Sequence, residues 1–147
     1  MSNSKNNSPN IRRKLALVIG NQNYVKRPLR HSENDANDLH AVLTDIGFTV
    51  DRELNLLVKM TAPGGSIIQF ACAPGYRAAD GYDQERNGLY TKYLLKHIAR
   101  PKVEINLIFR RITRDVFEES KAKQKPYIKG DLMTEEPIYL SAGDSND

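Results

Sequence analysis

The chain contains little of what disulfides and metal centres require. It has one cysteine, Cys72, and only three histidines among its 147 residues. A single cysteine cannot form an internal disulfide, which is typical of a reducing compartment. So few cysteines and histidines do not supply a zinc site built from these residues. We therefore expect a cytoplasmic protein without a metal ion or other cofactor.

Long apolar runs are also missing. No run approaches the roughly 20 residues that cross a bilayer, and the polar N-terminus lacks the apolar core of a secretory signal. The net charge is +4, and the basic residues are scattered in small groups. Nucleic-acid binding would be favoured by a dense basic face with aromatic platforms. We expect neither a membrane nor a nucleic acid as a partner.

The first half of the chain predicts the start of an α/β domain. Residues 15–19 are a continuous apolar run, typical of a strand buried on both faces. From Asn34 onward apolar residues recur at helical spacing, and Gly47 stands where a helix cap belongs. Residues 48–50 then predict a second strand. Strand, helix and strand in this order indicate an α/β architecture.

The second half adds further elements of the same kinds. Residues 51–65 hold no clear element. The expected elements are a buried strand over 66–72, a helix over 87–97, a loop over 124–128 and a last strand over 138–140. A third helix is predicted by an apolar stripe, formed by Ile105, Ile108, Phe109, Ile112 and Val116. The length fits one domain, which we place at residues 13–141, between a disordered tail over 1–12 and a C-terminal tail over 142–147.

Several short motifs, taken in order, resemble a known family. They are Leu-Ala-Leu-Val-Ile-Gly-Asn-Gln-Asn-Tyr at 15–24, Asn-Asp-Ala at 34–36, Ala-Cys-Ala-Pro-Gly at 71–75, Arg-Asn-Gly-Leu at 86–89 and Gln-Lys-Pro-Tyr at 124–127. The ordered set is similar to the caspase-like cysteine peptidase domain (peptidase C14, clan CD) of metacaspases and paracaspases. This resemblance implies a caspase-like three-layer α/β/α fold with a mostly parallel sheet.

The resemblance is interrupted where the family carries its chemistry. Its catalytic histidine lies in a Tyr-Ala-Gly-His-Gly type motif and its catalytic cysteine in an Asp-Cys-Arg type motif, and neither occurs in this sequence. Only residues 51–62 stand in that place, whereas two β–α units need about 60 residues. We interpret the chain as a caspase-like domain truncated by loss of two central strands, with the join near residues 56–58.

Three hypotheses for function follow from this interpretation. The family resemblance implies a cysteine-type endopeptidase that hydrolyses a peptide or protein substrate after a basic residue, but this chain lacks the segment with the Cys–His dyad. The first alternative is a non-catalytic interaction module, a homodimer or heterodimer with full-length caspase-like proteins. The second alternative is an active cysteine protease that uses Cys72.

Cys72 and His31 are the catalytic candidates of that second alternative. Cys72 ends a predicted strand, and His31 precedes it at a spacing near the caspase value of about 50 residues. Against this, Cys72 is followed by Ala-Pro, and His31 precedes the first helix, a position that the family does not use for its base. A buried structural thiol is the simpler interpretation of Cys72.

Asp35 and Asp80 are the substrate-binding candidates. The family resemblance implies that acidic residues near these positions line the pocket for a basic side chain, through charge-assisted hydrogen bonds. The alternative for Asp35 is an acid in the first helical turn, favoured by the helix dipole. The alternative for Asp80 is a solvated loop acid.

Loss of two central strands would leave two apolar strand edges unpaired, one on the strand at 15–19 and one on the strand at 66–72. Such edges promote association. The two strands could pair directly, a partner could complete the sheet, or the chain could fold poorly. The sequence leaves these outcomes open.

Overall fold

A computed structural model describes residues 14–20, 30–54, 65–81 and 84–141. The predicted tails and the join at 56–58 lie outside the described residues. Seven elements follow one another along the chain: β1 (Leu15–Gly20), α1 (Ser32–Asp45), β2 (Thr49–Leu54), β3 (Ser66–Phe70), α2 (Leu89–Ile98), α3 (Ile105–Glu119) and β4 (Tyr127–Asp131). The predicted α/β class is confirmed.

The strands form two separate two-stranded sheets. β1 and β2 are parallel, with a register from Leu15 opposite Thr49 to Gly20 opposite Leu54. β3 and β4 are antiparallel, and Phe70 lies opposite Tyr127. The described residues contain no ladder between β1 and β3, so the direct pairing considered from the sequence is not formed there.

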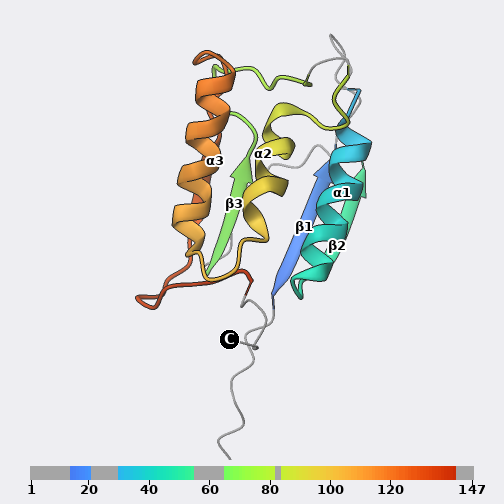
Figure 1. The fold of residues 1–147 in the computed structure, drawn as a ribbon. Coiled ribbons are helices and arrows are strands. Elements are labelled where there is room, and N and C mark those ends of the chain that lie inside the picture. Colours follow the sequence, from blue (N-terminus) through green and yellow to red (C-terminus); the bar gives the residue numbers. More distant parts are fainter. Residues whose placement is uncertain (1–13, 21–29, 55–64, 82–83, 142–147) are drawn as a thin grey trace, which may run out of the picture.

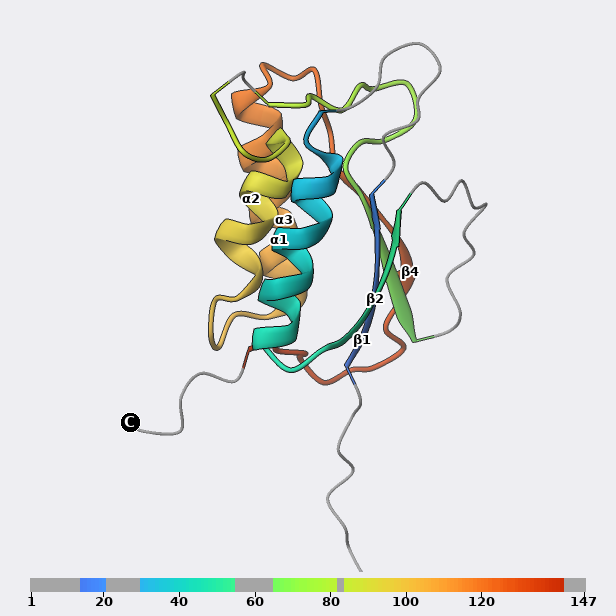
Figure 2. The same ribbon diagram turned by 90° about the vertical axis from the view of Figure 1, so that its right-hand side faces the viewer.

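The three helices lie together on one side of the strands, as Figure 2 shows. α1 covers β1 and β2, and α2 packs against both α1 and α3. In Figure 1 the three helices follow one another across the view in the order α3, α2 and α1. Of the three layers that the family resemblance implied, the described residues form the sheet layer and one helical layer.

The core is concentrated on α2 and α3. The expected stripe of α3 is confirmed, since its five apolar residues are all buried and Ile108, Ile112 and Val116 have no exposed surface. The rest of the buried apolar cluster is Ala36, Leu43, Leu89, Leu94, Ile98 and Leu140. Gly47 follows α1 with a φ of 89°, which confirms its predicted place at the helix end.

Three expectations about strands need correction. β2 continues to Leu54, although residues 51–65 show no clear pattern. β4 occupies Tyr127–Asp131, where a loop was expected through residue 128, because β3 supplies its hydrogen-bonded partner and the Phe70 and Tyr127 rings stack at 4.9 Å. Residues 138–140 do not form a strand, and among them only Tyr139 makes an isolated bridge, opposite Glu104.

Within the described ranges, no helix is both long and apolar enough to cross a membrane.

Candidate functional site

An acidic cluster lies where the first turn of α1 meets the loop that leads into α2. Asp35 and Asp38 are three residues apart on α1 and therefore lie on the same face of the helix. Asp80 belongs to the loop that follows β3, and residues 86–88 of that loop lie against α1. The cluster thus joins segments about fifty residues apart in the sequence, and the partners of each carboxylate define its chemistry.

The Asp80 carboxylate accepts hydrogen bonds from the backbone on the N-terminal side of α1. Its two oxygens accept from the backbone N–H of Arg30 at 2.6 Å and of His31 at 3.2 Å. These donors precede the helix, so Asp80 fixes the path of the chain into α1. An acid expected as solvated or as a pocket lining therefore also has a structural role here.

Asp35 is a half-buried carboxylate held by the start of α2. Its Oδ1 accepts from the Asn87 side-chain amide at 3.1 Å and from the Gly88 backbone N–H at 3.0 Å. Burial raises the pKa of Asp35, and hydrogen bonds from Gly88, Asn87 and Thr91 act in the opposite direction. A Cβ at Gly88 would lie 3.0 Å from Asp35 Oδ2, so a larger residue there would require the Asp35 side chain to shift by a few tenths of an ångström.

Asp38 is the third carboxylate of the cluster, and it forms an ion pair with Arg86. The Arg86 guanidinium donates two hydrogen bonds to the two Asp38 oxygens, both at 2.8 Å, in a fork-like arrangement. This contact lowers the pKa of Asp38. Asn87 donates to Asp38 at 3.0 Å as well as to Asp35, and it therefore bridges the two carboxylates.

His31 belongs to the same cluster. Its Nδ1 lies 3.0 Å from the carbonyl oxygen of Arg86, which also accepts from the Asn34 side chain at 3.1 Å. The structure therefore brings together three of the four residues singled out from the sequence: His31, Asp35 and Asp80. Their shared environment is a junction between α1 and the 80–88 loop.

Cys72 lies just beyond β3, half-buried and free of any disulfide. Burial raises the pKa of the Cys72 thiol, while a hydrogen bond with the Ala78 backbone acts in the opposite direction. An activated cysteine has a lowered pKa and a histidine within hydrogen-bond reach. Here the His31 ring contacts Arg86, and the buried His97 ring lies 2.7 Å from Asp115 through Nε2.

Gln124, which lies in one of the family motifs but was not among the predicted site residues, holds this region together. Gln124 has no exposed surface, and its side chain donates to the Ala71 carbonyl at 2.9 Å and accepts from the Ala79 backbone N–H at 2.8 Å. The loop that contains Cys72 and leads to Asp80 is thus fixed at both ends by one amide. A glutamine between two lysines carries no pattern that predicts burial.

In the part of the chain that the structure describes, no group of three or more His, Cys, Asp or Glu residues is arranged to hold a metal ion. The acidic cluster is instead occupied by the protein's own amide, guanidinium and backbone donors. Its available chemistry is hydrogen bonding and attraction of a cation.

Comparison with known proteins shows which family the chain belongs to. The sequence model of the Caspase domain, Peptidase_C14, matches residues 13–62 and residues 57–136. Together these segments cover most of the chain, so the chain belongs to the caspase-domain family. No curated protein matches it.

Solved structures agree on the fold. The crystal structure of caspase-1 from Spodoptera frugiperda has a TM-score of 0.66 at 12% identity, and the match covers 96% of this chain and 98% of that chain. A structure of pro-sf-caspase-1 has a TM-score of 0.56 at 14% identity, covering 86% and 97%. At these identities the similarity concerns the fold.

Proposed function

We propose that this chain is a non-catalytic member of the caspase-domain family, in which the segment with the catalytic histidine and cysteine has been lost. The observation that carries the proposal is the division of the family match into two segments, 13–62 and 57–136, which meet between β2 and β3. The printed sequence contains neither catalytic motif of the family. The parent activity, peptide-bond hydrolysis by a cysteine-type endopeptidase, is therefore absent from this chain.

The surroundings of Cys72 support this proposal. A thiol with a raised pKa stays protonated at neutral pH, whereas the attacking group in this chemistry is the thiolate. His31 is engaged with the Arg86 carbonyl, and His97 is buried against Asp115. Cys72 is then a structural thiol, and the alternative of an active protease based on Cys72 and His31 is the less favoured one.

Asp35 and Asp80 are proposed as the remnant of a pocket for a basic side chain. Asp35 Oδ1 already accepts two hydrogen bonds and each Asp80 oxygen accepts one, which supports a structural role. Asp35 Oδ2 and the second lone pair of each Asp80 oxygen can still accept from a guanidinium or ammonium group. Such a pocket would bind an arginine or lysine side chain without cleaving the chain that carries it. Titration with acetyl-arginine amide, followed by NMR, tests this: shifts confined to residues 30–38 and 80–88 are expected, and absence of shifts there contradicts it.

The test of inactivity is hydrolysis of fluorogenic peptides that end in arginine or lysine. We expect no release of fluorophore above the rate of buffer alone, for the native chain and for Cys72→Ala alike. An intact caspase-domain peptidase in the same buffer serves as the positive control. Turnover by the native chain that disappears in Cys72→Ala would overturn the proposal and favour the alternative enzyme.

A second candidate function is pairing with full-length caspase-domain proteins, whose family acts on proteins and forms dimers. The observation that favours it is the pair of separate two-stranded sheets, in each of which both strands have an outer edge without a ladder partner among the described residues. Size-exclusion chromatography with light scattering, run on the chain alone and mixed with a full-length relative, tests it. A 1:1 complex supports pairing, and two independent monomer peaks contradict it.

We also propose that residues 13–141 form the folded unit and that the protein is cytoplasmic. The extent is supported by the bridge between Pro101 and Ser141 and by the Lys14 side chain, which donates to the Leu140 carbonyl at 2.6 Å. Limited proteolysis should leave a fragment close to these bounds. Early cleavage within α2 or α3 would contradict it.

A further inference from the structure

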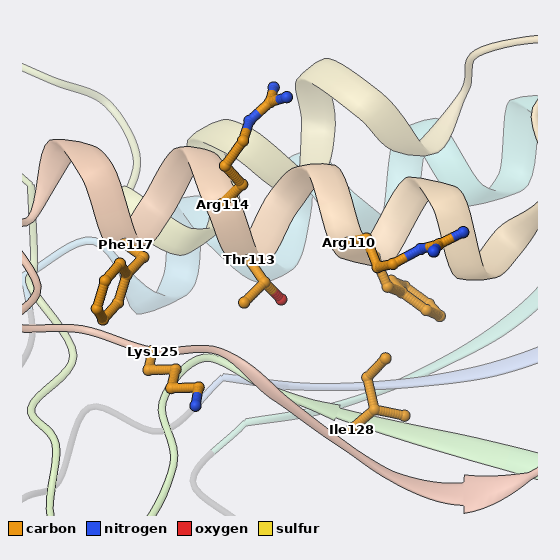
Figure 3. Close-up of a pocket in the computed structure, with 7 residues that line it drawn as sticks. Arg110, Thr113, Arg114, Phe117, Lys125 and Ile128 are labelled. Atoms are coloured by element: carbon orange, nitrogen blue, oxygen red, sulfur yellow. The ribbon is translucent and has the colours of Figure 1, made fainter.

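A groove of about 390 Å³ runs along the outer side of α3, between this helix and the chain segment that enters β4. Figure 3 shows Phe117 directed from the helix toward Lys125, and Ile128 directed from β4 toward the helix. The groove lies on α3 and β4, apart from the acidic cluster on α1 and the 80–88 loop. It is therefore independent of the function proposed above.

The floor of the groove is apolar. Phe109 is buried there, whereas Phe117 and Ile128 are 38% and 37% exposed. Two large exposed apolar side chains from different elements, which line the same concave site, form the kind of surface that binds an apolar group of a partner.

The helical period explains why this surface exists. Ile108, Ile112 and Val116 face the core, so the neighbouring row that contains Phe109 and Phe117 comes to lie at the edge of the helix. Ile128 lies opposite Gln69 in the antiparallel ladder and lines the groove together with residues of α3. Phe109 is already buried, but full burial of Phe117 and Ile128 would need a further element that the described residues do not provide.

The rim of the groove is cationic. Arg110, Arg114 and Lys125 line it. Arg114 is paired with Asp115 at 2.7 Å, but Arg110 and Lys125 have no ion-pair partner within the described ranges. Residues 110–129 contain seven lysines and arginines against three acidic residues, a surplus of four positive charges.

Two of those three acids are already engaged inside the protein. Asp115 pairs with His97 and Arg114, and Glu119 pairs with Lys92 and Tyr93. The positive surplus around the groove is consequently left for an outside partner.

We propose that this groove binds an acidic amphipathic peptide segment of a partner protein. Its apolar side chains insert between Phe117 and Ile128, and its carboxylates pair with Arg110 and Lys125. A second copy of this chain is disfavoured as the occupant, because a symmetric contact through the groove would bring the same cationic rims together. Charge complementarity therefore selects an acidic partner.

The test measures fluorescence anisotropy with three labelled peptides of equal length. The first carries leucine and phenylalanine among glutamates, the second replaces the glutamates by lysines, and the third replaces the apolar residues by serines. Only the first should bind, and its affinity should fall as salt is raised, because exposed charges are screened.

Matched variants locate the site. Arg110→Glu with Lys125→Glu should raise the Kd about tenfold or more, and Phe117→Ala should raise it about fivefold or more. Arg100→Glu, an exposed arginine at the end of α2, and Leu107→Ala, 36% exposed on the same helix but outside the groove, should leave the Kd unchanged. Circular dichroism verifies that each variant is folded.

A measurement on the native chain keeps the proposal testable if a variant fails to fold. NMR shifts on adding the first peptide should concentrate on residues 109–117 and 125–128. The proposal is overturned if shifts fall elsewhere, if the lysine peptide binds as tightly, or if the control variants weaken binding equally. Self-association that depends on Phe117 would likewise overturn it, by assigning the groove to a second copy.

Discussion

The N-terminal and C-terminal parts of the molecule are stabilised in different ways. In the C-terminal part, α2 and α3 pack on each other, and their buried side chains make up most of the apolar cluster of the described residues. In the N-terminal part, α1 contributes only Ala36 and Leu43 to that cluster. The parallel pair β1 and β2 is a two-stranded sheet, which is marginal without packing against other elements.

Long-range polar contacts compensate for this difference. Lys14 donates to the carbonyls of Leu140 at 2.6 Å and Ile46 at 3.1 Å, and its ammonium lies 5.7 Å from the centre of the Phe48 ring. Asp35 and Asp80 connect α1 to the loop that precedes α2. The acidic cluster therefore also attaches the N-terminal part to the rest of the domain.

The largest expected effect comes from the C-terminal core. Ile112→Ala should lower the free energy of unfolding by about 2–5 kcal/mol, because it removes a fully buried side chain from α3. Urea denaturation followed by circular dichroism measures it. Arg110→Ala, its exposed near neighbour, should change stability by less than about 0.5 kcal/mol. Equal effects would contradict the assigned core.

Gly88→Ala should disrupt the junction between the two parts. The added Cβ would lie 3.0 Å from Asp35 Oδ2, and overpacking of this kind costs about 1–3 kcal/mol. Hydrogen exchange should show faster opening of α1, while α3 keeps its protection. Asp35→Ala in the same chain should relieve part of the loss, and strictly additive effects would contradict a direct contact.

The stability of the C-terminal part should depend on pH through Glu119. Hydrogen bonds from Lys92 and then Tyr93 lower the pKa of Glu119 in the folded state. Its contribution is therefore present at neutral pH and is lost as pH falls through the folded pKa. Glu119→Gln should flatten the decline of thermal stability toward acid pH. Glu118→Gln, at the exposed neighbouring residue, should not flatten this decline. Equal flattening by both variants would show that Glu119 does not cause the pH dependence.

Asp35 should act in the opposite direction. Because burial raises its folded pKa, its proton is bound more tightly in the folded state, so its contribution favours folding as pH falls toward that pKa. Asp35→Asn keeps an acceptor for the Gly88 N–H and removes this titration. The native chain should therefore gain stability relative to Asp35→Asn as the pH falls toward the folded pKa of Asp35, and a difference in unfolding free energy that does not vary with pH would contradict the assignment.

The smallest effect should come from Arg86→Lys. Arg86 is 63% exposed, so its pair with Asp38 is screened by solvent, although lysine cannot reproduce the two parallel hydrogen bonds. We expect a decrease in Tm smaller than that caused by Gly88→Ala. A decrease as large as that of Ile112→Ala would mean that the junction, not the core, dominates stability.

The sequence predicts what local periodicity controls. The stripe on α3 and the glycine after α1 follow from helical spacing and from backbone conformation, and both are confirmed. β4 was missed because its pairing with β3 brings together segments far apart in the chain.

Contacts between segments far apart in the sequence also determine the arrangement of the candidate site. The burial of Gln124 and the fork between Arg86 and Asp38 depend on the tertiary arrangement, which no local pattern encodes. Asp35 and Asp80 were selected through family resemblance. Their partners at Gly88 and before α1 became visible only in three dimensions.

Whether Cys72 is catalytically inert is tested most directly by labelling it with an arginine-bearing acyloxymethyl ketone and measuring the intact mass. We predict that this probe modifies Cys72 no faster than a simple alkylating reagent does. Rapid, stoichiometric labelling of Cys72 that a peptide ending in arginine blocks, and that Asp35→Asn abolishes, would contradict it.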